Sequence, residues 1–154
     1  MSVNTCTMAF LNLSCEIDDR KLFNEVSCTI EPGQILRVAG SNGAGKTTLL
    51  RILADLREPD SGTVMINGEQ LSQYRDRLLY FGHRSQISRD LTVLENLQFL
   101  TDVDTSTLHS ALSHVGLIGF GNTLARELSE GQGRRSALAR LWCNPPPVWI
   151  LDEP

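Results

Sequence analysis

The sequence predicts an α/β fold with a mixed sheet, an N-terminal antiparallel β region and a helical insertion. Apolar and polar residues alternate through the first third of the chain, which is typical of half-buried strands. A short apolar run, a glycine-rich loop and a helix-spaced run follow in that order, and the spacing stays mostly helical from residue 90 to residue 142. A chain of 154 residues is about one domain long. We therefore predict a single domain over residues 1–154, with a helical subdomain at about 84–142.

The N-terminal β region is predicted from short alternating stretches that turn signals separate. Residues 10–13 and 26–30 have the two-residue period of strands, and residues 31–33 (Glu-Pro-Gly) form a turn after the second stretch. Residues 63–66 lead into Asn67 and Gly68, a dipeptide that favours positive φ and therefore a tight hairpin.

The remaining elements follow from apolar runs and helix breakers. Residues 35–39 are a β-prone run that ends at Gly40, and residues 47–56 have helical apolar spacing. Later helices are expected at residues 91–100, 108–115 and 132–142, the last of them ended by three prolines. Residues 148–151 are all apolar, so we expect a strand buried on both faces.

Composition excludes several classes of function. The net charge of −4 and the pI near 5.3 leave no basic field for nucleic acid. The apolar stretches are far shorter than the roughly 20 residues of a spanning helix, and the N-terminus has no secretory signal pattern. The four cysteines form no C-x-x-C pair, which argues against zinc and favours reduced thiols in the cytoplasm.

The strongest motif lies between the predicted strand at 35–39 and the helix that follows. It matches the P-loop pattern G-x-x-x-x-G-K-[ST], whose glycines let backbone N–H groups point at phosphate oxygens while the helix adds its positive end. Lys46 would reach the β and γ phosphates, and Thr47 would offer its hydroxyl to Mg²⁺. The predicted ATP-binding residues are Gly40, Ser41, Asn42, Gly43, Ala44, Gly45, Lys46, Thr47 and Thr48.

A second motif stands at the end of the predicted strand 148–151. Asp152 and Glu153 follow that apolar run, as in the Walker B pattern, in which a strand delivers acidic residues beside the phosphate loop. Asp152 would hold the Mg²⁺ shell together with Thr47, and Glu153 would polarise the attacking water as the catalytic residue. Without the P-loop, this pattern would equally describe a solvated strand end.

A third motif decides among nucleotide-binding families. It comprises Leu128, Ser129, Glu130, Gly131 and Gln132 and opens a predicted helix, so Ser129 and the first N–H groups offer a second anion site. Alone, it would be an ordinary serine-capped helix. The segment resembles the signature motif of ABC ATPases, usually Leu-Ser-Gly-Gly-Gln, with Glu130 in place of one glycine.

The resemblance to ABC ATPases covers essentially the whole chain. It implies a P-loop NTPase fold, Mg²⁺ and ATP as cofactors, and a homodimer in which each signature caps the γ-phosphate held by the other subunit. Residues 40–53, 82–83, 91–97, 137–142 and 149–154 are similar to the branch that powers haem export for c-type cytochrome maturation. That branch implies an integral membrane permease as partner, peripheral placement on the cytoplasmic face of the inner membrane, and only indirect contact with haem.

The sequence departs from the family pattern at several places. In the family, the Q-loop carries a glutamine that contacts both Mg²⁺ and the membrane partner. That position falls near Arg84 in this sequence, and arginine has only hydrogen-bond donors and cannot ligate a cation. Gln86 is therefore the candidate for the role if the loop shifts. The family's adenine-stacking aromatic would fall around residues 15–17, which contain none. The sequence stops at Asp152-Glu153-Pro154, before the family's D-loop, switch histidine and last core strands. From this we expect ATP binding without turnover.

Other functions remain as alternatives at this point. A soluble ABC ATPase of DNA repair or translation would use the same nucleotide chemistry, as would an exporter subunit for a different cargo. A P-loop kinase or small GTPase has no use for the segment Leu128 to Gln132. An ATP-binding module without turnover is the third possibility.

Overall fold

The computed structural model describes residues 6–82, 87–143 and 145–152. The chain divides into two compact units, which are described separately. The first contains the chain up to Tyr80 together with Pro146–Asp152, and the second contains Phe81–Pro145. That the whole chain is a single ATP-binding domain with a helical subdomain at about 84–142 stays a prediction.

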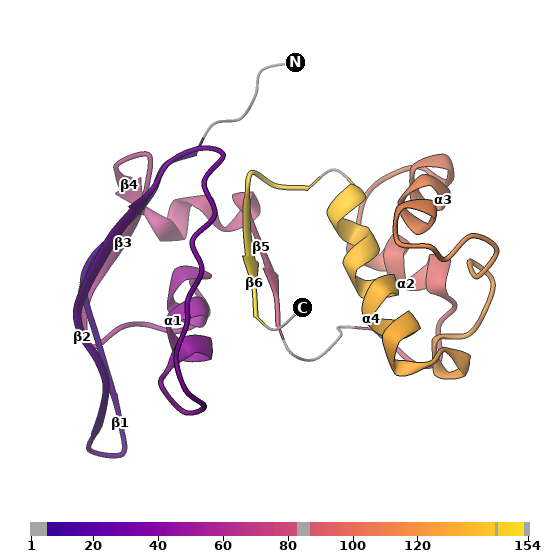
Figure 1. Ribbon diagram of the computed structural model, residues 1–154. Helices are drawn as coiled ribbons and strands as arrows, with labels where there is room; N and C mark the ends of the chain where they lie inside the picture. The colour runs from indigo at the N-terminus through magenta and orange to yellow at the C-terminus, as the bar shows by residue number, and fades with distance from the viewer. Residues whose placement is uncertain (1–5, 83–86, 144, 153–154) are drawn as a thin grey trace. The chain divides into compact units, whose positions relative to one another are not determined.

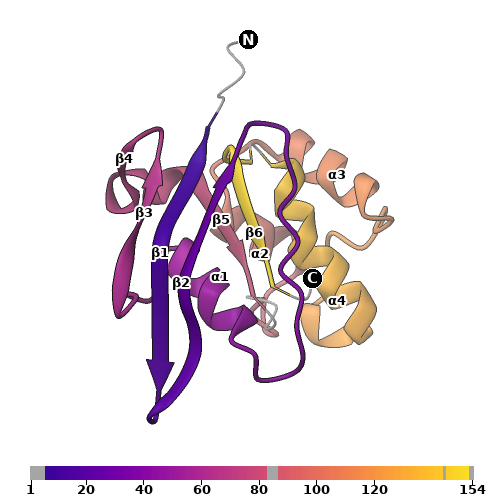
Figure 2. The same cartoon turned by 60° about the vertical axis from the view of Figure 1, so that its left-hand side comes forward.

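An antiparallel four-stranded sheet in the order β2-β1-β3-β4 forms one side of the first unit (Figure 1). Its strands are β1 (Met8–Ile17), β2 (Arg20–Ile30), β3 (Ser61–Ile66) and β4 (Glu69–Gln70). Figure 2 shows β1 and β2 as long neighbouring ribbons, which pair from Met8↔Ile30 to Ile17↔Arg20. The predicted N-terminal antiparallel β region is confirmed, with strands longer than the alternating stretches that indicated them.

Two tight turns in this sheet follow from residues that tolerate positive φ. Asp18 and Asp19, with φ of 50° and 60°, join β1 to β2. Asn67 and Gly68, with φ of 53° and 83°, join β3 to β4, where Ile66 pairs with Glu69. The hairpin predicted at Asn67-Gly68 is therefore confirmed.

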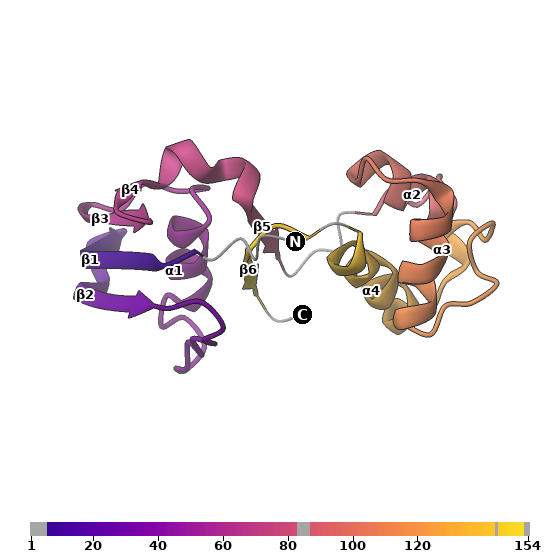
Figure 3. The ribbon, with the colours of Figure 1, turned by 90° about the horizontal axis from the view of Figure 1, so that it is seen from above.

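Helix α1 (Lys46–Leu53) carries the apolar face that packs on this sheet. Its buried residues Leu49, Ile52 and Leu53 share one core cluster with residues such as Phe10 and Ile66. Figure 3 places α1 between the four-stranded sheet and a second sheet, formed by β5 (Leu78–Phe81) and β6 (Val148–Leu151). The 3₁₀ segment η1 (Leu71–Arg77) leads into β5.

The helix predicted at residues 47–56 is confirmed in position but ends earlier, at Leu53. Asp55 adopts a positive φ of 56°, and the N–H of Leu56 donates to the carbonyl of Arg51 at 2.9 Å. This closure satisfies a terminal helix carbonyl and turns the chain away from the helix axis. Apolar spacing beyond Leu53 therefore does not extend the helix.

Two strand predictions were wrong in detail. Residues 35–39 form no strand, and Ile35 is 95% exposed, because β propensity yields a strand only where a neighbour supplies ladder hydrogen bonds. Strand β6 exists, but it is not buried on both faces. Ile150 is buried whereas Trp149 is 47% exposed, so one side of β6 faces the core and the other does not.

The second unit consists of short helices around its own apolar cluster. They are α2 (Val93–Leu100), α3 (Thr105–His114) and α4 (Glu130–Leu138), with α4 continued by the 3₁₀ segment η3 (Ala139–Trp142). A further 3₁₀ turn, η2 (Ala125–Glu127), precedes α4. The core of the unit contains Val93, Leu97, Leu108, Ala111, Leu112, Leu117, Ala139 and Cys143. The predicted helical character of this region is confirmed.

Side-chain caps start all three helices. Thr92 forms a capping box with Glu95, and Asp104 accepts from the N–H groups of Ser106 and Thr107. Hydrogen bonds from Ser106 and Thr107 hold the pKa of Asp104 well below its ordinary value, so this cap stays ionised in mild acid.

In the part of the chain that the structure describes, no helix has the length and apolar character needed to span a bilayer.

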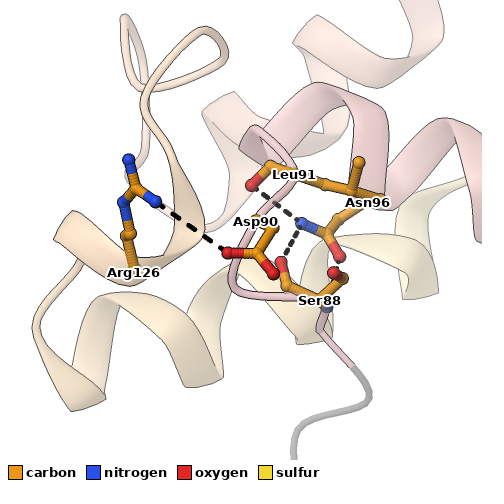
Figure 4. Close-up of polar contacts among 5 residues, drawn as sticks. All are labelled: Ser88, Asp90, Leu91, Asn96 and Arg126. Carbon is orange, nitrogen blue, oxygen red and sulfur yellow. Dashed lines mark hydrogen bonds and ion pairs between the residues drawn. The ribbon is translucent and has the colours of Figure 1, made fainter.

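A buried asparagine fastens the start of α2 to the chain before it (Figure 4). Asn96 is only 4% exposed, and its Oδ1 accepts from the N–H of Ser88 at 2.7 Å. Its Nδ2 donates to the carbonyls of Ser88 at 2.9 Å, Leu91 at 3.3 Å and Thr92 at 2.9 Å. One buried amide thus makes four hydrogen bonds to the backbone before and at the start of α2, which satisfies its own polar atoms inside the unit. The neighbouring ion pair of Arg126 with Asp90 is long, at 3.9 Å, and exposed, and it contributes little.

We expect Asn96→Ala to lower the free energy of unfolding of the second unit by about 2 kcal/mol, because four hydrogen bonds from one buried side chain are lost. Thermal unfolding followed by circular dichroism measures this loss. Gln98→Ala, at an exposed position of the same helix, is the matched control and should change stability little. Equal stability of the two variants would contradict a fastening role for Asn96.

Candidate nucleotide site

The predicted phosphate loop adopts a conformation that depends on its glycines. Gly43 and Gly45 have φ of 78° and 90°, the left-handed region that residues with a Cβ rarely enter. A Cβ on Gly45 would lie 3.0 Å from the Cβ of Leu22 and 3.3 Å from Cδ1 of Phe23, both on β2. The loop is therefore packed against the first sheet. It also curls on itself, because the N–H of Ala44 donates to the carbonyl of Ser41 at 3.2 Å.

Lys46 lies across this loop. Its Nζ donates to the carbonyl of Gly40 at 2.9 Å and to that of Ser41 at 3.0 Å. An ammonium group has three donors, so a third remains for a phosphate oxygen. The charge is thus held at the loop by backbone carbonyls.

The N-terminus of α1 adds a second source of positive potential. The helix starts at Lys46 after Gly45, whose position offers no side-chain cap, and its first turn contains no acidic residue. The first N–H groups of a helix have no partner within the helix and carry the positive end of its dipole. Thr47 and Thr48 lie in this first turn. The arrangement suits the phosphates of a nucleotide.

Two hard oxygen ligands meet beside the loop, although 105 positions separate them in the sequence. The Oγ1 of Thr47 donates to the Oδ1 of Asp152 at 3.1 Å, and Asp152 is only 3% exposed. A hydroxyl and a carboxylate suit Mg²⁺, which usually takes few protein ligands and completes its shell with water and phosphate oxygens. Among the described residues, no group of three or more His, Cys, Asp or Glu side chains is placed to hold a metal.

A further residue, which no sequence motif marks, lies at this place. Tyr80, near the end of β5, donates from its hydroxyl to the Oδ2 of Asp152 at 3.1 Å. Burial raises the pKa of Tyr80 above its ordinary value, and Asp152 adds to this effect against the opposing influence of Arg51. The phenol therefore remains protonated, and a donor, at neutral pH. No local pattern marks Tyr80, since a tyrosine in an apolar strand is common.

The signature segment lies in the second unit and opens α4. The N–H of Gln132 donates to the Oγ of Ser129 at 3.2 Å, and the N–H of Ser129 donates to the Oε1 of Gln132 at 2.8 Å. These two bonds form a capping box, so the segment does begin a serine-capped helix, which is the structure expected of it without the other motifs. Ser129, Glu130 and Gly131 are exposed, whereas Leu128 packs against the core of the unit.

The structure brings together only some of the predicted site residues. Residues 40–48 and Asp152 gather in the first unit, and Leu128 to Gln132 form a separate segment of the second. Glu153, the predicted catalytic residue, and Gln86 and Arg84, the alternatives for the Q-loop, lie outside the described residues.

Comparisons with known proteins agree with this geometry. The ABC transporter family profile matches residues 23–154. The cytochrome c biogenesis ATP-binding export protein CcmA of Shigella sonnei is 49% identical over 147 residues, which are 92% of this chain and 71% of that protein. The protein of the same name from Yersinia pestis is 47% identical over 151 residues, 93% of this chain and 69% of the relative.

Solved structures of ABC ATP-binding domains share the fold of this chain. An ABC transporter ATP-binding protein from Pyrococcus furiosus superposes with a TM-score of 0.87 at 25% identity, over 96% of this chain and 75% of its own. A bacterial Atm1-family ABC exporter with ATP bound shares the fold with a TM-score of 0.83 at 23% identity, over 99% of this chain and 30% of its own. With its phosphate loop, its Thr47–Asp152 contact and these likenesses, the chain belongs to the ABC transporter family, among the ATP-binding subunits.

Proposed function

We propose that the chain binds Mg-ATP on residues 40–48 and forms the nucleotide-binding part of an ATP-hydrolysing subunit of an ABC exporter. The observation that carries this proposal is the convergence of Lys46, the start of α1 and the Thr47–Asp152 pair in one place. Lys46 and the first N–H groups of α1 would hold the phosphates, and Thr47 and Asp152 would hold Mg²⁺, which neutralises charge on the phosphates. Glu153 is proposed to orient the attacking water, and Gln86 to fill the Q-loop role.

Hydrolysis is proposed to require two copies of the chain. The signature segment presents an exposed serine at a helix N-terminus, which suits a phosphate group, and a two-fold homodimer would bring it to the nucleotide of the other copy. Glu130 places a negative charge in the first turn of α4, so dimerisation is expected to depend on Mg²⁺ to offset repulsion.

Substitutions at Ser129 test this pairing. Ser129→Asp keeps a good helix cap but sets a negative charge against the phosphate, so ATP-dependent dimers should disappear in light scattering. Ser129→Thr preserves both cap and hydroxyl and is the matched control. If Ser129→Asp dimerises with ATP as the parent does, the signature does not meet the nucleotide.

We propose haem export for c-type cytochrome maturation as the process that this subunit powers. The support is the name of the relatives and their 47–49% identity over more than nine-tenths of this chain. The partner would be an integral membrane permease, with the subunit held at the cytoplasmic face of the inner membrane. Haem itself would be recognised by the membrane partner, and contact with this chain would be indirect.

Deletion of the gene in its own host, followed by haem staining of c-type cytochromes, tests the cargo. We expect the cytochromes to be lost and to return with the parent gene, but not with a gene that carries Lys46→Ala. Normal cytochrome levels after deletion would remove haem export and leave the ATPase proposal to an exporter of another cargo.

A further inference from the structure

Asp152, the proposed Mg²⁺ ligand, accepts a hydrogen bond on each of its two carboxylate oxygens. Thr47 donates to Oδ1 and Tyr80 donates to Oδ2, each at 3.1 Å. The two donors come from different elements, α1 and β5, and Asp152 follows β6 directly. Strand β5 pairs with β6 (Figure 2). This pairing brings the phenol of Tyr80 to Asp152.

The two donors have different roles in this arrangement. A hydroxyl such as that of Thr47 can donate its proton to the carboxylate while its oxygen lone pairs remain for a cation. The phenol of Tyr80 donates to the other oxygen, which fixes the rotation of the carboxylate group about its last bond. Mg²⁺ demands near-octahedral geometry with short bonds, so a ligand whose orientation is fixed beforehand binds it better.

We propose that Tyr80 is a positioning residue that orients Asp152 for Mg²⁺. The inference rests on the proposed function, because it presupposes a Mg-nucleotide at Thr47 and Asp152. Tyr80 is half-buried, its hydroxyl contacts Asp152, and its proposed effect on Mg²⁺ passes through that carboxylate. A purely structural tyrosine would stabilise the fold and leave the Mg²⁺ dependence of nucleotide binding unchanged.

The test compares Tyr80→Phe with Tyr74→Phe in the 154-residue chain. Tyr74 is the other tyrosine of the chain, and its hydroxyl also donates to a carboxylate, the Oε2 of Glu69 at 2.9 Å, away from the nucleotide site. Both variants therefore lose one phenol hydroxyl bonded to a carboxylate. Binding of a fluorescent ATP analogue is measured in EDTA and across a Mg²⁺ titration.

We expect Tyr80→Phe to bind the analogue in EDTA as the parent does, while the Mg²⁺ concentration at half effect rises about tenfold. Tyr74→Phe should match the parent in both measurements. Equal Mg²⁺ midpoints for Tyr80→Phe and the parent would overturn the inference. Failure of the proposed function looks different, since Lys46→Ala would then bind the analogue in EDTA as tightly as the parent.

A second measurement covers the case in which Tyr80→Phe does not fold. In Tyr74→Phe, Tyr80 is the single tyrosine, so the Raman doublet of tyrosine reports the hydrogen bonding of its phenol alone. We expect the signature of a strong donor, and its loss when Asp152→Ala is added. An unchanged doublet in the double variant would show that Tyr80 does not hold Asp152.

Discussion

Replacing Lys46 with alanine is expected to weaken ATP binding by about two orders of magnitude, since charge-assisted hydrogen bonds to phosphate are lost in one step. The same change removes the donor that the carbonyls of Gly40 and Ser41 share, so the loop also loses the contact that holds it curled. Equilibrium binding of a fluorescent ATP analogue, read by anisotropy, measures the effect.

The chain supplies a convenient control, because Lys21 is its only other lysine. Lys21→Ala removes the same charge from an exposed position on β2 and should leave ATP binding close to that of the parent. If Lys46→Ala binds ATP with the affinity of the parent, the proposal of a nucleotide site at residues 40–48 is wrong. The roles proposed for Thr47, Asp152 and Tyr80 would then be wrong as well.

The largest loss of stability is expected from Gly62→Ala. Gly62, in β3, has φ of 91°, and a Cβ there would lie 2.5 Å from the carbonyl oxygens of Leu11 and Asn12. Both atoms are backbone of β1, where the register with β3 is irregular between Leu11 and Ser14, so no side chain can move aside. We expect a loss of about 3 kcal/mol or more in the free energy of unfolding, measured by urea denaturation.

Gly68→Ala separates the two causes of that loss, which are the strain of a Cβ at positive φ and the clash with the carbonyl oxygens of β1. Gly68 has a similar φ of 83°, but a Cβ there would meet nothing within 4 Å. Its substitution should cost only the backbone strain, about 1 kcal/mol. If both variants lose the same stability, the close approach of β3 to the carbonyls of β1 has no energetic weight.

Features set by residues close in sequence were predicted well. The β3–β4 hairpin at Asn67-Gly68, the turn at residues 31–33 and the capped helix at Ser129 depend on the conformational limits of a few adjacent residues. The backbone conformation of residues 40–47 is local in the same sense, because its glycines, Lys46 and Thr47 are consecutive or nearly so, and the role of this loop in holding phosphates stays a prediction.

Features that need a partner far along the chain were predicted less well. Residues 35–39 have β propensity but no strand, and β6 has an apolar sequence but an exposed side. The polar residue Asn96 stands among apolar positions of α2, and its burial follows from carbonyls up to eight residues earlier. A polar residue on the inner face of an amphipathic helix is the signal that would have found it.

The sequence by itself determined the family, and it predicts the phosphate loop, because short motifs carry both in consecutive residues whose backbone geometry is local. The motifs predicted that Asp152 and Thr47 serve one site, but only the tertiary structure showed their direct contact across 105 positions and the hydrogen bond from Tyr80 to the second oxygen of Asp152. The physical reason is that such contacts are made by the pairing of β5 with β6 and the packing of α1 beside them. Strand neighbours and register depend on the whole fold, and a single stretch of sequence does not contain them.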